Sequence, residues 1–408
     1  MAYIRKAGSS IILSWYSLPV IMGIFQSSLF AATPQFIALT GLATWQWSIL
    51  LSLPTLFFLV LSPRWGRWAD KSGASYVIRY SAVGLSLSII SFAIIWWLGV
   101  SYTFSPLVWF IAIGFSRILY GISASGVMPI CQSLALDTST VKEGSDDSLK
   151  RLGWVSAGLS VGRIVGPVLL LLFAVYMGWL FGIFCAAAIV SLVFISRFSV
   201  KHAPRRKQQP MTDKAEPTSL HPSITLMLCM AFAVTLYVGY LQFVLGPLFL
   251  DWMETSEEAT KLMSLTMLVV AAVALLCQVF IVKRLAWRSP SILSVLALIL
   301  TLASLSLGWV HQPLVILIAV IPMALSIALM TPVYSRLAMA SSEASKGQTS
   351  GRLAVAHTAG YPAGSLLAGL FYSISPDYWW LPLCLIACFI GLVSARLQLM
   401  PQSQLQQS

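Results

Sequence analysis

The chain has 408 residues, of which 58% are hydrophobic and only 9% are charged. A soluble globular protein carries roughly 25% charged residues, so this composition excludes a water-facing surface of ordinary size and indicates a protein of the lipid bilayer. The formal net charge of +12 does not indicate a nucleic-acid partner, because the basic residues fall in short clusters between apolar runs.

The predicted elements are helices, because each apolar run matches the roughly 20 residues that an α-helix needs to cross a bilayer. The predicted spans cover residues 11–32, 45–61, 77–99, 106–134, 152–174, 178–198, 223–250, 262–282, 290–309, 314–335, 352–373 and 379–397. We therefore predict an all-α integral membrane protein with twelve transmembrane helices in two pseudo-symmetric six-helix bundles, 1–198 and 223–408. The proline-rich, basic stretch 199–222 is predicted to be a cytoplasmic linker between them.

The basic residues orient these spans. Loops rich in Arg and Lys alternate with loops in which Lys261 stands alone against five acidic residues. Because this is the positive-inside pattern, we expect both termini and the linker on the cytoplasmic side of a multi-pass protein of the inner (plasma) membrane. The first run is too long for a signal peptide and the next span follows closely, so it is predicted to stay as the first span.

Uncharged polar residues lie at matching points of the first and seventh spans. Gln26 follows Gly23 by three residues, and Gln242 follows Gly239 by the same interval. Tyr240 lies between Gly239 and Gln242. Such side chains in a bilayer face a cavity or bond to a neighbouring helix. We predict that Gln26, Gln242 and Tyr240 line a substrate cavity, with helix–helix hydrogen bonding as the alternative.

The segment after the second span begins at Gly66 and ends at Gly73, with Asp70 and Lys71 between them. It resembles the signature of the loop between helices 2 and 3 in the major facilitator superfamily, although the two positions after Gly73 are not basic. The resemblance implies a tight turn at the glycines and a latch in which Asp70 meets the positive N-terminus of a helix in the other half. The alternative is a simple basic anchor loop.

The fourth span contains a buried arginine. Arg117-Ile118-Leu119-Tyr120-Gly121 resembles a second motif of the same superfamily, with Tyr120 where glutamine is usual. An arginine inside a bilayer costs at least about 3 kcal/mol on insertion scales, so it needs a partner, a cavity or water. We predict a cavity or proton-relay role for Arg117, with pairing to backbone carbonyls as the alternative.

The fifth span holds Gly153, Gly162, Gly166 and Pro167. Their spacing resembles the antiporter motif of drug exporters in the superfamily, although leucines replace its later glycine pair. The resemblance implies close helix contact along the glycines and a bend at Pro167 that assists alternating access; a generic seam of small residues is the alternative.

The glycine spacing of the fifth span recurs 198 residues later, in the eleventh span. The recurring residues are Gly351, Gly360 and Gly364. Matching glycines in corresponding spans support duplicated halves, which is how secondary transporters are usually built, with the substrate site near the midplane.

Arg163 follows Gly162, and no Asp or Glu falls deep in a predicted span. Together with Arg117, Arg163 predicts a positive central cavity that favours an anionic substrate; pairing of Arg163 with Asp137 is the alternative. Because carboxylates are lacking there, His357 of the eleventh span is a candidate proton-carrying cavity residue, or else a packing residue.

The remaining motifs exclude other chemistry. The six cysteines all fall inside apolar runs and are typical of buried hydrophobes, and no Walker loop or metal-ligand cluster occurs. We therefore expect no metal and no cofactor. The tryptophans, Trp96 among them, lie mostly near span ends and are typical of interface anchors rather than of a substrate box.

The sequence is thus identified as resembling the twelve-span drug–proton antiporters of the major facilitator superfamily. The resemblance implies a transporter, not an enzyme, that exports an amphipathic small molecule in exchange for protons. The two arginines favour an anionic substrate, and we expect the protein to be a monomer. A drug, as in multidrug resistance, or a secreted metabolite such as a siderophore fits this description. One alternative is an importer or exchanger of small organic anions on the same fold, and another is a non-transporting membrane sensor or scaffold.

Overall fold

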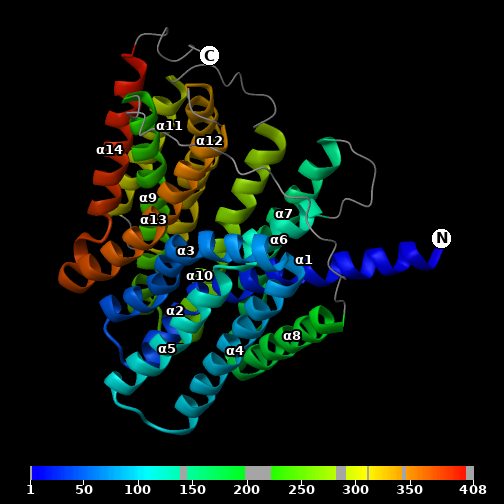
Figure 1. Ribbon diagram of the computed structural model, residues 1–408. Helices are drawn as coiled ribbons and strands as arrows, with labels where there is room; N and C mark the ends of the chain where they lie inside the picture. Colours follow the sequence, from blue (N-terminus) through cyan, green and yellow to red (C-terminus); the bar gives the residue numbers. More distant parts are fainter. Residues whose placement is uncertain are drawn as a thin grey trace. The chain divides into compact units, whose positions relative to one another are not determined.

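The protein is described by a computed structural model that covers residues 2–137, 145–197, 222–281, 291–309, 312–341 and 346–400 (Figure 1). Within these ranges the chain is almost entirely helical and contains no strand. The N-terminal helices are α1 (Ala2–Ala31), α2 (Thr33–Thr40), α3 (Thr44–Ser72), α4 (Ala74–Ser101), α5 (Pro106–Ala124), α6 (Val127–Asp137), α7 (Ser145–Phe173), η1 (Ala174–Tyr176) and α8 (Met177–Arg197). The C-terminal helices are α9 (Pro222–Trp252), α10 (Ser256–Leu276), η2 (Cys277–Ile281), α11 (Ser291–Ser306), η3 (Leu307–Trp309), α12 (Pro313–Ala340), α13 (Lys346–Ile374), η4 (Pro376–Tyr378) and α14 (Leu381–Gln398).

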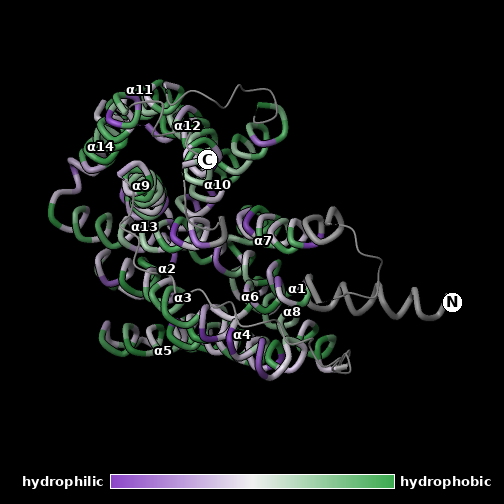
Figure 2. The backbone as a smooth tube through the Cα atoms, turned by 45° about the horizontal axis from the view of Figure 1, so that its top comes forward, coloured by the Kyte–Doolittle hydropathy of each residue, from purple (hydrophilic) through white to green (hydrophobic). Residues whose placement is uncertain are grey.

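Nine stretches of the described residues are long and apolar enough to cross a bilayer, and ten when the bent pair α1–α2 is counted. One of them, Arg151–Ser196, contains both α7 and α8. Helix α13 is 29 residues long but too rich in small and polar residues to be counted. With α1–α2 and α5–α6 each counted as one span, the α-helices form two sets of six, and the predicted all-α, twelve-helix membrane fold is confirmed. Figure 2 shows the hydrophobic stretches along the helices.

The chain divides into two compact units. Residues 1–42 and 53–212 form the first unit, and residues 43–52 and 213–408 form the second. The first turns of α3 therefore group with the C-terminal helices: the hydroxyl of Ser52 donates to the carbonyl of Pro362 in α13 at 3.3 Å. The predicted linker, 199–222, lies outside the described residues except for Pro222, the first residue of α9.

Two breaks in the N-terminal helices were not predicted. The first span ends at Ala31, and α2 continues at an angle of 59° to it. Pro34 in the first turn of α2 favours this restart, and Gly41 ends the helix in the left-handed conformation, with φ 61°. The expected single helix over 106–134 is instead interrupted between α5 and α6.

The interruption between α5 and α6 lies against a side chain of another helix. The indole N–H of Trp65 in α3 donates to the carbonyl of Ile122 at 2.8 Å, which satisfies an acceptor that the end of a helix leaves open. The same ring lies so close to Gly126 that a Cβ atom there would be 2.7 Å from it. Only glycine fits at this position against the packed indole.

The core of the first unit is aromatic. The ring centroid of Phe25 in α1 lies 5.8 Å from that of Phe92 in α4 and 5.6 Å from that of Tyr120 in α5. Phe92 in turn lies 5.8 Å from Phe181 of α8, and all four rings are buried. Large buried rings at these spacings stabilise the bundle through contact area, and the Phe25–Phe92 pair, at an interplanar angle of 85°, also has the favourable edge-to-face geometry. They fix the helices that hold the candidate site.

Candidate functional site

Helices α1 and α7 pack backbone to backbone through glycines. A Cβ atom on Gly162 would lie 2.8 Å from the nitrogen of Ile24 and 3.0 Å from the Cα atom of Gly23, and one on Gly166 would lie 2.7 Å from the carbonyl oxygen of Ile24. The hydroxyl of Ser27 donates to the carbonyl of Gly162 at 3.4 Å. Because side chains would hold the helices apart, the glycines of the antiporter-like motif set this close contact.

The other two residues of that motif behave differently. Gly153 is exposed and has no atom within 4 Å of where its Cβ would be, so it takes no part in the seam. Pro167 is buried, and α7 continues through it to Phe173. The conformational roles of Gly153 and Pro167 stay predictions.

The second unit repeats this arrangement between α9 and α13. A Cβ atom on Gly360 would lie 3.0 Å from the nitrogen of Leu236, and one on Gly364 would lie 2.7 Å from the nitrogen of Tyr240. The hydroxyl of Ser365 donates to the carbonyl of Gly239 at 3.2 Å. Gly351, which corresponds to Gly153, likewise has nothing around its Cβ position. The repeated glycine spacing therefore has a structural counterpart in each unit.

Arg117 is enclosed in the first unit. Its side chain is 2% exposed, and its Cζ atom lies 4.7 Å from the ring centroid of Tyr120, one turn later in α5. Tyr120 is itself fully buried, and its hydroxyl reaches the carbonyl of Met22 at 3.5 Å. An aromatic face attracts a cation most when both are withdrawn from water, so the ring stabilises the buried guanidinium.

Arg163 lies on α7, directly after the seam glycine Gly162, and is exposed. Arg117 is enclosed, so of the two arginines Arg163 is the one at the surface of the first unit. A single cavity lined by both stays a prediction. Asp137, the alternative partner for Arg163, ends α6, and its side chain lies outside the described residues.

The polar residues of the first and seventh spans fall into two groups. Gln26 in α1 and Gln242 in α9 are half-buried. Tyr240 is fully buried, and its hydroxyl donates to the carbonyl of Trp379 at 2.8 Å. Tyr240 therefore fastens α9 to the segment just before the last helix, α14. Its cavity-lining role stays a prediction.

His357 makes a contact that its sequence neighbours do not reveal. It is half-buried on α13, and its Nε2 atom lies 2.6 Å from the hydroxyl of Tyr334 on α12. The periodicity of apolar residues (i, i+3, i+4, i+7) shows which residues share one face of a single helix. It does not show which residues of two different helices meet, so the sequence contains no signal for this pair.

The segment from Gly66 to Gly73 is mostly helical rather than a loop. Gly66, Asp70 and Lys71 lie in the last turns of α3, and only Gly73, with φ 91°, forms the turn into α4. The expectation that both glycines form the turn is therefore wrong for Gly66. Asp70 and Lys71 are exposed. The latch between Asp70 and a helix N-terminus stays a prediction.

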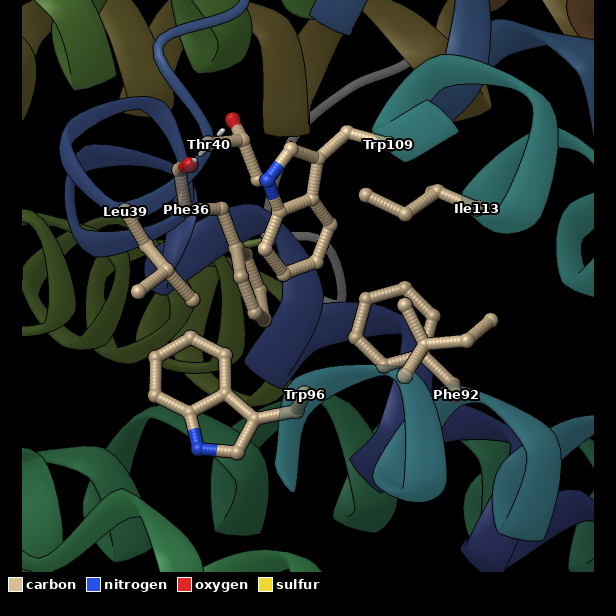
Figure 3. A pocket seen from close by; sticks show the side chains of 8 residues that line it. Phe36, Leu39, Thr40, Phe92, Trp96, Trp109 and Ile113 are labelled. Atoms are coloured by element: carbon tan, nitrogen blue, oxygen red, sulfur yellow. Dashed lines mark hydrogen bonds between the residues drawn. The ribbon is translucent and has the colours of Figure 1, made fainter. Parts of the chain in front are cut away.

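A small aromatic pocket of about 10 Å³ lies in the first unit (Figure 3). Its walls come from α2, α4 and α5: Phe36, Leu39, Thr40, Phe92, Ile95, Trp96, Trp109 and Ile113. Trp96 is 9% exposed and lies 5.2 Å from Phe36, so the expectation of an interface anchor is wrong for this residue. A cavity of about 10 Å³ is at the limit of what one water molecule needs, whereas drug-sized sites measure roughly 300–1,000 Å³, so this pocket is a packing gap between rings and not a substrate site.

Comparison with known sequences gives a consistent assignment. The profile of the Major Facilitator Superfamily matches residues 7–351. The tetracycline resistance protein, class H, of Pasteurella multocida is 25% identical over 360 residues, which cover 85% of this chain and 84% of that protein. Multidrug resistance protein 2 of Bacillus subtilis is 29% identical over 217 residues, so the chain matches about half the length of that relative.

Solved structures with the same fold include transporters of several kinds. A D-xylose–proton symporter superimposes with a TM-score of 0.74 at 12% identity, covering 97% of this chain and 99% of that one. The human organic anion transporter MFSD10 superimposes with a TM-score of 0.63 at 17% identity, covering 97% and 99%. At such low identities these similarities establish the fold alone.

Proposed function

Because the chain belongs to the major facilitator superfamily and is a multi-pass membrane transporter rather than an enzyme, we propose that it exports an amphipathic, anionic small molecule. Export proceeds by alternating access, with protons moving inward in exchange. The protein works as a monomer in the inner (plasma) membrane, with both termini in the cytoplasm. The relatives support the export direction, because tetracycline, multidrug and quinolone resistance proteins recur among them.

The observation that carries the substrate class is the charge distribution of the first unit. Arg117 is buried in α5 against the ring of Tyr120, and Arg163 follows the seam glycine Gly162 on α7. Every acidic residue in the described part of the chain lies at or beside a helix end: Asp70, Asp137, Asp146, Asp147, Asp251, Glu254, Glu257, Glu258 and Asp377. Two fixed positive charges without a carboxylate among the helix middles favour a ligand that carries negative charge.

Transport into proteoliposomes under an imposed pH gradient tests this proposal. The probes differ in charge. Two are zwitterionic (tetracycline and a quinolone), one is cationic (ethidium) and one is anionic (a catechol siderophore). We expect gradient-driven movement of an anionic or zwitterionic probe against its own gradient, because a positive site selects negative charge. Ethidium, which is purely cationic, serves as the probe of opposite charge.

Two arginine variants sharpen the test. Arg163→Gln removes one of the two charges, and a lost interaction of about 1.4 kcal/mol corresponds to about tenfold weaker transport of the anionic probe. Arg396→Gln, in the exposed last turn of α14, is the matched control and should transport normally. Proton-driven uptake in the same direction as the proton flux identifies an importer instead, and normal transport by Arg163→Gln contradicts the charge-based substrate class.

A further inference from the structure

Two titratable side chains of the second unit form a pair between α12 and α13. The hydroxyl of Tyr334 lies 2.6 Å from Nε2 of His357, and the two ring centroids are 5.7 Å apart at an interplanar angle of 64°. Tyr334 is fully buried, and His357 is half-buried. The geometry is that of a single short, enclosed hydrogen bond between two helices.

The protonation of His357 could also respond to other titratable or charged groups on the elements packed against α13. These groups are few: Cys229, Tyr237, Tyr240 and Asp251 of α9, Arg336 of α12, and Asp377 and Tyr378 of η4. The first turns of α3, 44–52, contribute none.

Most of these groups are engaged elsewhere. Tyr237 bonds to the hydroxyl of Ser304 at 2.8 Å, and Tyr240 donates to the carbonyl of Trp379. Asp251 accepts a hydrogen bond from Tyr372, near the other end of α13. Arg336, Asp377 and Tyr378 are exposed, and Cys229 is half-buried. The described contacts therefore leave Tyr334 as the titratable partner of His357.

On α13 itself the nearest charged residue is Arg352, five positions before His357, and the nearest other titratable residue is the half-buried Tyr361, four positions after it. Five residues correspond to a rotation of about 140° around a helix, so Arg352 and His357 point to different faces, whereas Tyr361 shares a face with His357. The local charge at the pair is therefore determined by the pair itself.

We propose that His357 is the proton carrier of this transporter and that Tyr334 controls its protonation through the hydrogen bond. The proposal rests on the proton antiport proposed above and assigns the coupling to the second unit. Histidine is the side chain that ordinarily changes charge between about pH 5 and 8, and the described helix middles offer no carboxylate for the task.

Protonation reverses the hydrogen bond. In the neutral imidazole whose Nε2 accepts, the Tyr334 hydroxyl is the donor. After uptake of one proton, Nε2–H donates to the Tyr334 oxygen, and the hydroxyl hydrogen of Tyr334 rotates away from the imidazole. No other bond forms or breaks, and the charge at the contact between α12 and α13 rises by one.

The decisive variants keep the shape of the pair and remove one property each. His357→Gln retains a hydrogen-bonding side chain but does not titrate, and Tyr334→Phe leaves the histidine titratable without its partner. Tyr378→Phe, at a residue that is 59% exposed, is the matched control. Gradient-driven accumulation of tetracycline in proteoliposomes is compared with its exchange at equal pH on both sides.

We expect His357→Gln to lose at least about tenfold of the gradient-driven accumulation while its exchange stays within about twofold of the wild type, because only the coupling between proton and substrate is removed. Tyr334→Phe should shift the pH at which accumulation is half-maximal. Tyr378→Phe should match the wild type in both assays.

A second readout needs no substrate. Titration of the detergent-solubilised protein against a pH indicator should show about one proton fewer taken up between pH 8 and 5 by His357→Gln than by the wild type. An equal proton count, or full gradient-driven accumulation by His357→Gln, overturns the assignment. Loss of exchange together with accumulation in folded His357→Gln and Tyr334→Phe also overturns it, because the pair then belongs to the substrate path.

These outcomes are distinct from failure of the proposed antiport. If the wild type itself moves no probe with the pH gradient, proton antiport fails and the role of His357 as a carrier fails with it. If the wild type is coupled and His357→Gln is equally coupled, only the assignment of His357 fails.

Discussion

In each unit one pair of helices packs backbone to backbone through glycines, α1 with α7 and α9 with α13. The residues beside the two seams differ. The first unit places Arg163 next to Gly162 and encloses Arg117 in α5, whereas the second places the Tyr334–His357 pair beside its seam. An arginine stays charged at every physiological pH, while a histidine does not. The repeated frame thus carries a fixed charge in one unit and a titratable group in the other.

This difference suggests a division of roles. A fixed charge suits a substrate of opposite sign and cannot release a proton, and a neutral titratable pair suits proton exchange. Both groups lie close to a seam whose geometry is set by glycine. The following predictions test the shared frame first and then the residues that distinguish the two units.

The largest effect is expected from filling the seams. Gly162→Val and Gly360→Val place a side chain where the opposing backbone lies within 3.0 Å of the Cβ position. Because the helices must separate, each variant should lose about 1–3 kcal/mol of stability, the range for overpacked cores, and most of its transport. Thermal unfolding in detergent and the proteoliposome assay measure both. A stable, active Gly360→Val beside an inactive Gly162→Val would show that the two seams are not equivalent.

The next effect concerns the enclosed charge. Arg117→Gln should weaken transport of an anionic probe about tenfold, corresponding to about 1.4 kcal/mol, and Arg117→Lys should recover part of it because the positive charge remains. The planar stack on Tyr120, at 4.7 Å, is lost in both variants. Equal impairment in Gln and Lys would indicate that the stacking geometry matters and the charge does not. The uptake rate at several probe concentrations separates these outcomes.

A smaller effect separates the buried tyrosines of the two units. The hydroxyl of Tyr240 donates at 2.8 Å, whereas that of Tyr120 reaches its acceptor only at 3.5 Å. Tyr240→Phe should therefore cost about 0.5–1.5 kcal/mol of stability, and Tyr120→Phe should cost less, since the energy of a hydrogen bond falls with distance. Unfolding midpoints of the two variants give the comparison. A greater loss for Tyr120→Phe would assign its hydroxyl a role beyond the contact with Met22.

These residues also show what the sequence alone can predict. The spans follow from apolar length, and the paired seams follow from a glycine spacing that recurs in order, because both signals are local. The break between α5 and α6 depends on Trp65 of another helix, and the partner of Tyr240 lies 139 residues away. The contact of His357 with Tyr334 is likewise formed between helices. Such partners depend on how helices pack, and no periodicity within one helix encodes them.

The smallest effect is expected at the two motif glycines outside the seams. Gly153 and Gly351 lie inside helices with nothing near their Cβ positions. Gly153→Ala and Gly351→Ala should each stabilise the protein by about 0.5–1 kcal/mol, because alanine favours a helix over glycine. Transport should be unchanged in both, measured beside the unfolding midpoint. A different outcome would be loss of transport at full stability in Gly153→Ala but not in Gly351→Ala. Gly153 would then lie close to other residues in a second conformation of the transporter. The antiporter-like motif would have a gating role that only the first unit retains.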